Sequence, residues 1–179
     1  MAGAGHPPAA HNRRMRSKLY SRPRARSGFS LIELLVALAI VGILASIAYP
    51  SFMGSIRKSR RSDAISALTR LQQAQEQHRS NFAKYAGTPD GLPSSGGLGL
   101  STSSPDGHYS IAISNNTEIG YVASATAKSS SPQVDDSACQ VLTISIGQGV
   151  TNLAGLITRS STSAGGAVNS SDNNPCWVK

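Results

Sequence analysis

The segment Phe29–Tyr49 is the feature of this sequence that most constrains the fold. It reads FSLIELLVALAIVGILASIAY, has 21 residues and is apolar except for Ser30, Glu33 and Ser46. As an α-helix it would extend about 30 Å, which matches the hydrocarbon core of a bilayer. The 179-residue chain contains no second run of this kind. We therefore expect one membrane-spanning helix followed by one domain outside the membrane.

The positive charge of the chain is concentrated before this segment. Residues 1–28 contain seven Arg or Lys and no Asp or Glu, whereas residues 29–179 contain 10 basic and 9 acidic side chains, a net charge of +1. Basic flanks stay on the cytoplasmic side of a membrane, so the N-terminus is expected there and the body outside. The near-neutral body gives nucleic-acid binding only weak support, because such binding needs a basic surface.

The stretch 51–86 predicts an amphipathic helix. Pro50 directly precedes it and is expected to kink the helix rather than end it, because helical patterning resumes at once. Apolar residues recur mostly at spacings of three or four, so one face must be buried; they are Phe52, Ile56, Ile65, Leu68, Leu71, Ala74, Phe82 and Tyr85. The cations between them include a cluster predicted to lie at lipid headgroup level or to line grooves between subunits: Arg57, Lys58, Arg60 and Arg61.

The rest of the chain predicts a small antiparallel sheet. Residues 87–107 are rich in Gly, Pro and Ser and form a connecting loop. Three short alternating runs then predict strands: His108–Ser114, Ile119–Lys128 and Cys139–Ile146. Residues 147–179 are interpreted as an irregular loop that returns to the sheet, and the adjacent acids Asp135 and Asp136 as a solvated turn. The fold class is therefore α+β, with a long N-terminal helix packed on three or four strands.

Two cysteines, Cys139 and Cys176, stand at the two ends of this C-terminal region. Outside a membrane the compartment is oxidising, which favours a disulfide between them. Closing a loop of this length would contribute about 4 kcal/mol in the chain-entropy model. The alternative is a pair of unrelated free thiols.

Glu33 is unusual because a carboxylate inside a bilayer costs roughly 2.5–3.5 kcal/mol on insertion scales. No cation inside Phe29–Tyr49 can pair with it, so its partner is expected on another chain or at the chain's own terminal amine. An ordinary secretory signal peptide cut after Ala48 is the competing interpretation. The apolar run is longer than the usual h-region, and Glu33 near its start argues against that alternative.

The run Gly28-Phe29-Ser30-Leu31-Ile32-Glu33, followed by unbroken apolar sequence, resembles the class III signal of type IV pilins and pseudopilins. The resemblance implies a leader, residues 1–28, that a prepilin peptidase cuts after Gly28 and an N-methylation of the new terminal residue, Phe29. Glu33 is retained in the helix for assembly with other pilin subunits. Gly42 and Pro50 match the family's pattern too and imply a stretch of helix that loosens during assembly.

The implied architecture is the type IV pilin fold. Residues 29–50 form the transmembrane and assembly helix, and 51–86 form the amphipathic helix of the globular domain. The loop 87–107 leads to 108–179, the antiparallel sheet with a disulfide-stapled C-terminal loop. The chain is then a single-pass inner-membrane protein before assembly and part of an extracellular pilus afterwards.

The resemblance predicts a structural subunit of a type IV pilus, used in adhesion, twitching motility or DNA uptake. The C-terminal stretch CQVLTISIGQG, followed by Cys176 and Trp177, is most like PilE-type minor pilins. A major pilin, a DNA-binding competence pilin and a type II secretion pseudopilin are the alternatives, and the cysteine pair argues against the last. No catalytic motif is present, so we expect no enzyme, no cofactor and no metal site.

Overall fold

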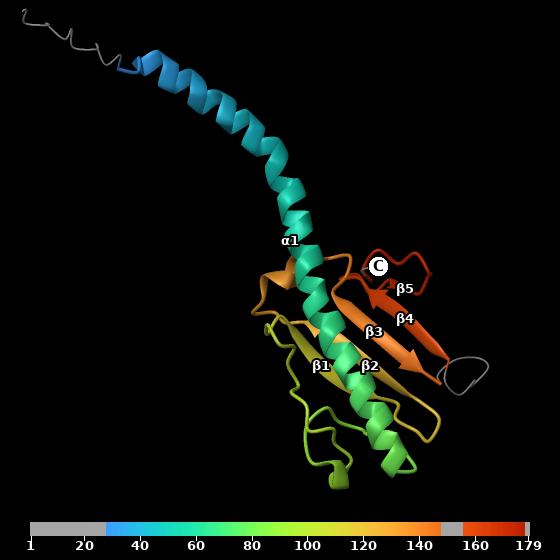
Figure 1. Ribbon diagram of the computed structural model, residues 1–179. Coiled ribbons are helices and arrows are strands. Elements are labelled where there is room, and N and C mark those ends of the chain that lie inside the picture. The colour runs from blue at the N-terminus through green and yellow to red at the C-terminus, as the bar shows by residue number, and fades with distance from the viewer. Residues whose placement is uncertain (1–27, 148–155, 178–179) are drawn as a thin grey trace, which may run out of the picture. The chain divides into compact units, whose positions relative to one another are not determined.

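The computed structural model describes residues 28–147 and 156–177 (Figure 1). The predicted leader, except for Gly28, lies outside the described residues, as do parts of the predicted C-terminal loop. The chain divides into two compact units, one ending at Gly42 and the other beginning at Ile43. A single α-helix, α1, covers Leu31–Asn81. After it come the short 3₁₀ helices η1 (Pro93–Ser95) and η2 (Pro132–Asp135) and a sheet of five strands.

The sheet has the order β1-β2-β3-β4-β5, and every neighbouring pair is antiparallel. Its strands are β1 (Tyr109–Ser114), β2 (Tyr121–Ala127), β3 (Val141–Ile146), β4 (Ile157–Thr162) and β5 (Val168–Asn169). The expectation of three or four strands, with an irregular segment from residue 147, was wrong. β4 pairs along its whole length with β3 but is mostly polar and exposed, so its sequence carries little strand patterning.

The helix α1 extends without interruption through Pro50, and its C-terminal half lies across one face of the sheet (Figure 1). It ends at Asn81, four residues before the predicted end near Tyr85. The Asn81 side-chain amide donates to the Gln77 carbonyl oxygen, 3.0 Å away, within the last turn. The Tyr85 backbone amide instead donates to Thr117, so Tyr85 belongs to the loop that meets the sheet.

The core lies between α1 and the helix-facing side of the sheet. Its buried members are Ala64, Ala67, Leu68, Leu71, Tyr109, Ile111, Tyr121, Ala123, Ala125, Leu142, Ile144 and Ile146. Burial raises the pKa of the Tyr109 phenol to about 12, and it also raises the pKa of Tyr121. The long helix and the antiparallel sheet thus confirm the predicted fold class.

The helix face that packs on the sheet differs from the predicted face at both ends. Phe52 is 63% exposed and Phe82 is 40% exposed, although both were assigned to the buried stripe. Three polar residues are buried instead, namely Asp63, Gln75 and His78. Gln75 accepts from and donates to the backbone of Ala86, with both distances 2.9 Å. Because that exchange satisfies the amide, a polar side chain can occupy a core position.

Asp63 holds the loop that leads into β1. Its carboxylate accepts hydrogen bonds from the Ser104 hydroxyl at 2.5 Å and from the Asp106 backbone amide at 3.0 Å. The Ser104 hydroxyl oxygen in turn accepts from the Tyr109 amide at 2.9 Å. A buried carboxylate on the helix therefore orders the polar loop before the sheet begins.

Glycine is required where β2 begins and β3 ends. Gly147 has a φ of +62°, and a Cβ built there would stand 2.1 Å from the Ile119 carbonyl oxygen. On the facing strand, a Cβ at Gly120 would stand 1.9 Å from the Ile146 carbonyl oxygen. The two backbones approach so closely that neither position has room for a side chain.

Candidate functional site

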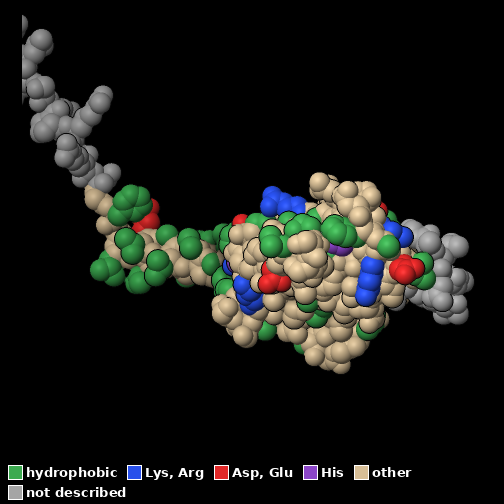
Figure 2. Space-filling model, turned by 90° about the horizontal axis from the view of Figure 1, so that it is seen from below, with side chains coloured by type: hydrophobic (Ala, Val, Ile, Leu, Met, Phe, Trp, Pro, Cys, Tyr) green, Lys and Arg blue, Asp and Glu red, His purple; other side chains and the backbone are tan. Residues whose placement is uncertain are grey.

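The first part of α1 is an apolar surface that no other described part of the chain covers. Gly28, Phe29 and Ser30 precede the helix, and every residue from Gly28 to Tyr49 is exposed. Phe29 is 82% exposed and Ile47 is 71% exposed. Figure 2 shows these apolar side chains crowded on the helix near its N-terminal end. By length and composition α1 is able to cross a membrane.

Glu33 lies in the first turn of α1 and is exposed. A carboxylate in this position is favourable for the helix, because the backbone amides of the first turn carry partial positive charge. Among the described residues no hydrogen bond or ion pair to the Glu33 side chain is present. Its carboxylate is thus free to pair with a cation supplied from outside this chain.

Gly42 and Pro50 both lie inside α1. The question at Gly42 is side-chain packing, and at Pro50 it is helical hydrogen bonding. A Cβ built on Gly42 meets nothing within 4 Å, so packing against the other described residues does not require glycine there. Pro50 lacks a backbone N–H, so it cannot donate the helical hydrogen bond to the carbonyl of Ser46. The roles of both residues in assembly stay predictions.

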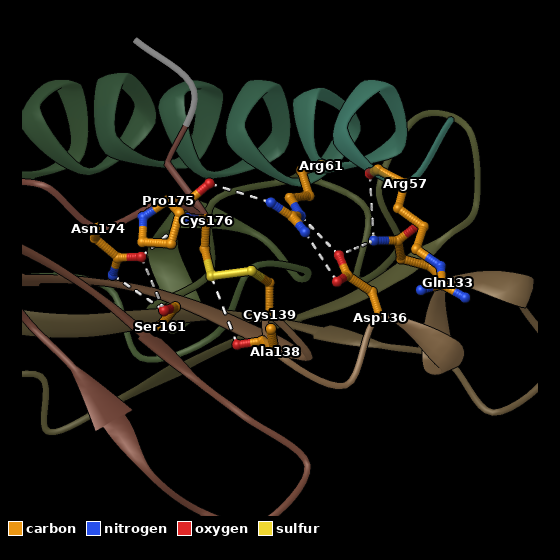
Figure 3. Close-up of polar contacts among 10 residues, drawn as sticks. All are labelled: Arg57, Arg61, Gln133, Asp136, Ala138, Cys139, Ser161, Asn174, Pro175 and Cys176. Carbon is orange, nitrogen blue, oxygen red and sulfur yellow. Dashed lines mark hydrogen bonds and ion pairs between the residues drawn. A yellow bond between two sulfur atoms is a disulfide. The ribbon is translucent and has the colours of Figure 1, made fainter. Parts of the chain in front are cut away.

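The second candidate site is a set of contacts that joins α1 to η2 and the C-terminal tail (Figure 3). We call it the clasp; its residues are Arg61, Gln133, Asp136 and Pro175. The Arg61 guanidinium donates to both oxygens of Asp136, from Nε at 2.6 Å and from a terminal nitrogen at 2.9 Å. Its other terminal nitrogen donates to the Pro175 carbonyl oxygen at 3.1 Å. The Gln133 side-chain amide adds a bond to Asp136 at 2.8 Å. One helix side chain therefore holds both η2 and the tail.

The tail is also fixed covalently. Cys139, just before β3, and Cys176 form a disulfide with their Cα atoms 5.5 Å apart, as predicted. Next to it, Asn174 exchanges hydrogen bonds with the buried Ser161 hydroxyl on β4, at 3.0 and 3.1 Å. The Trp177 indole N–H donates to the Ser160 carbonyl at 3.0 Å. The last described residues are thus tied to the sheet at several points.

This clasp corrects two interpretations made from the sequence. Asp136 is not solvated but only 3% exposed, whereas its neighbour Asp135 is exposed. Arg61 does not point toward lipid or a subunit groove, because its guanidinium is occupied within the chain. The residues of the clasp were missed because 75 positions separate Arg61 from Asp136, and no local spacing connects them.

The remaining charges on the folded body are mixed in sign. Between residues 51 and 177 the described part has 9 Arg or Lys and 8 Asp or Glu. Figure 2 shows Lys and Arg side chains interspersed with Asp and Glu on the face it presents. Arg159 lies 5.9 Å from the centroid of the Trp177 ring, which places a cation beside an aromatic face. Within residues 28–147 and 156–177, no group of three or more His, Cys, Asp or Glu side chains is placed to hold a metal ion.

Two protein-family models match the chain in adjacent segments. Residues 23–49 match the prokaryotic N-terminal methylation motif. Residues 50–143, slightly more than half of the chain, match the family described as "Type IV minor pilin ComP, DNA uptake sequence receptor". The first match covers the apolar part of the helix, and the second extends from the amphipathic half of α1 to the middle of β3.

Individual relatives match over shorter stretches. The type II secretion system core protein G of Aeromonas hydrophila is 36% identical over 69 residues, covering 38% of this chain and 48% of that protein. The type IV major pilin protein PilA of Myxococcus xanthus is 44% identical over 64 residues, covering 36% of this chain and 29% of that protein. The chain therefore spans about half the length, or less, of these curated relatives.

Proposed function

The chain belongs to the type IV pilin family, and from that premise we propose that it is a minor pilin, anchored in the inner membrane before it is packed into a pilus. The exposed apolar surface of Phe29–Tyr49 carries this proposal. A surface of this size is stable only in lipid or against other apolar helices. Membrane insertion and then filament assembly provide those two environments in turn. Its function is assembly rather than catalysis.

Maturation prepares this helix for assembly. We propose that the peptidase cuts between Gly28 and Phe29 and that the Phe29 amine is then methylated. Gly28 and Phe29 are exposed and precede the first helical turn, so the proposed scissile bond lies in accessible, non-helical backbone. After cleavage, the Phe29 amine of one subunit pairs with Glu33 of a neighbour. Either charge alone would be costly in an apolar bundle, so the pair sets the axial register of the subunits.

A role in DNA uptake is the more specific form of the proposal. It is supported by the family model that matches residues 50–143, whose description names a DNA uptake sequence receptor. The described body has almost no net charge, so DNA would be held by a few local cations rather than by a broad basic surface. Exposed candidates are Arg70, Lys84 and Arg159.

The alternatives differ in copy number and in the filament they enter. A major pilin would dominate the protein of sheared pili, and a pseudopilin would be absent from them. The disulfide between Cys139 and Cys176 favours a pilin over a pseudopilin, on the family resemblance described above. The likeness to protein G of Aeromonas hydrophila covers 38% of this chain, which leaves much of the folded body outside it.

Quantitative mass spectrometry of sheared pili tests the proposal. The chain is expected in these pili, starting at Phe29, at a small fraction of the major subunit. A deletion strain should keep its pili but lose DNA uptake, and the wild-type chain supplied in trans should restore it. Absence of the chain from the pili would refute the pilus proposal. Unchanged DNA uptake in the deletion strain would refute only the more specific role.

A further inference from the structure

Three cations at the start of the folded body form no side-chain interaction with the described part of the chain. Arg57, Lys58 and Arg60, here called the basic collar, follow the apolar segment closely and make no side-chain hydrogen bond or ion pair among the described residues. Arg61, the fourth cation of the sequence cluster, is taken up by Asp136 and Pro175. The collar is therefore a separate group with its charge unneutralised.

The geometry points to a membrane surface as its partner. We propose that the basic collar binds the phosphates of anionic phospholipids on the outer face of the inner membrane. At 3.6 residues per turn, the three side chains lie within about 160° of the helix circumference, so they present a single charged sector. Arg57 lies eight residues beyond Tyr49, about 12 Å along a helix axis. The interfacial layer itself is about 5–8 Å thick on each side of the hydrocarbon core.

The direction of helical side chains shortens the remaining distance between the collar cations and the lipid phosphates. Side chains on an α-helix tilt toward the helix N-terminus, which for this helix is the direction of the apolar segment. The long stems of Arg and Lys can extend along an apolar surface while the charged group stays in the polar layer. The collar can thus reach back to the phosphates from a position above them.

The residues between the apolar segment and the collar are of the type found at membrane interfaces. Tyr49 is 66% exposed and Phe52 is 63% exposed. With Ile56 and Arg60 they form one stripe, at spacings of three, four and four residues. Tyr and Trp are enriched at the headgroup level of membranes, so Tyr49 suits that level and the stripe leads from it to a cation.

The position of the collar also calls for an anionic partner. Lys and Arg are normally enriched on the cytoplasmic flank of a membrane helix, and the collar is on the opposite flank in the proposed topology. Anionic lipid attracts a juxtamembrane cation by about 1 kcal/mol, which corresponds to about a fivefold preference. The inference rests on the membrane-anchored stage of the proposed function, and it adds a lipid interaction that must be released when the subunit enters the filament.

Lipid selectivity of the chain from Phe29 onward, which lacks the seven cations of residues 1–28, tests the inference in vesicles. Spin-labelled phosphatidylglycerol and phosphatidylcholine compete for the lipid shell, and at low salt the wild-type chain should prefer phosphatidylglycerol about fivefold or more. The variant Arg57→Gln/Lys58→Gln/Arg60→Gln should associate nearly equally with phosphatidylglycerol and phosphatidylcholine. The matched control, Arg70→Gln/Lys84→Gln/Arg159→Gln, removes the same charge from exposed positions on the folded body and should keep the wild-type preference.

Each contrary outcome has a distinct meaning. If wild type inserts but shows no preference, or the collar variant keeps it, the lipid inference is wrong and the pilin proposal is untouched. If the collar variant keeps the lipid preference but loses binding to a double-stranded oligonucleotide, the cations serve DNA instead. Failure of the wild-type chain to insert in any vesicle would overturn the membrane-anchored stage and this inference together. Circular dichroism of both variants checks that they keep the wild-type helix content.

Discussion

Arg61 on α1 and Asp136 after η2 form a two-point ion pair, with Nε 2.6 Å from Oδ2, across 75 positions of the sequence. The side chains are 14% and 4% exposed, so the pair is largely shielded from water. Arg61 also reaches Pro175, next to the disulfide at Cys176. The helix α1 is therefore connected through one guanidinium to the C-terminal segment beside Cys176.

Breaking this pair should loosen the tail. Arg61→Gln leaves Asp136 buried without its cation, and we expect a loss of about 2–3 kcal/mol in the free energy of unfolding, somewhat below the usual cost for fully buried pairs. Denaturant titration of the detergent-solubilised chain measures it. Arg70→Gln, an exposed cation on the same helix, should change stability by less than about 0.5 kcal/mol. Equal effects of the two substitutions would mean that the clasp contributes nothing specific.

The disulfide should stabilise the domain independently of the clasp. Cys139 and Cys176 are 37 positions apart, and the chain-entropy model gives about 4 kcal/mol for a loop of this length. The variant Cys139→Ser/Cys176→Ser should lower the midpoint of unfolding and speed proteolysis after residue 147. Thiol alkylation of the wild-type chain without reductant should label neither cysteine. Ready labelling of both would show that the bond does not form in the exported protein.

Glu33→Val should separate membrane insertion from filament assembly. The substitution removes a carboxylate from the apolar segment, so the variant should remain in the membrane at least as stably as wild type. Cleavage after Gly28 should continue, because Glu33 lies beyond the scissile bond. The sheared-pilus fraction should lose the variant, since the Phe29 amine would be buried without a partner.

Immunoblotting of the membrane fraction and of the sheared-pilus fraction measures where Glu33→Val accumulates. The control Glu76→Gln removes an exposed carboxylate from the same helix outside the apolar segment and should assemble normally. Entry of Glu33→Val into pili at the wild-type level would show that the carboxylate does not guide assembly.

Gly147→Ala should be strongly destabilising. The added Cβ would meet the Ile119 carbonyl oxygen at 2.1 Å, and the residue has a positive φ. Strain of this kind costs on the order of 1–3 kcal/mol, and the contact with backbone adds to it. Gly165→Ala is the matched control, because a Cβ there meets nothing within 4 Å. Thermal unfolding of both variants should show a large shift only for Gly147→Ala.

Stability should fall at alkaline pH because of the buried phenols. The pKa of Tyr109 is raised from 10.0 to about 12 by burial, so between these values the unfolded chain releases a proton that the folded chain keeps. The contribution of this phenol to stability is therefore complete below pH 10 and is lost as the pH rises toward 12. Unfolding midpoints measured across this range should fall less steeply for Tyr109→Phe than for wild type. A parallel pH dependence in the two proteins would contradict the assignment.

Much of the architecture was predictable because local patterns carry it. The apolar run of 21 residues predicts a membrane-spanning helix from its length and composition alone. The α+β class followed from alternating strands behind an amphipathic helix, and the disulfide followed from two cysteines in a region expected to lie in an oxidising compartment. At the candidate site, Glu33 stood out because a single carboxylate in an apolar run is costly wherever the helix goes.

Tertiary structure decided three features that the sequence did not predict. They are the clasp, the outer strands of the sheet and the face of α1 that is buried. Gln75 and Asp63 are polar residues that can be buried only because Ala86, Ser104 and Asp106 supply their hydrogen bonds. β4 is a strand because β3 provides its hydrogen-bonding edge, not because its own residues are apolar. By itself the sequence determined which segments are apolar, charged or able to cross-link. Only the folded chain decided which polar groups find partners, because those partners lie tens of residues away and the free energy of burial depends on meeting them.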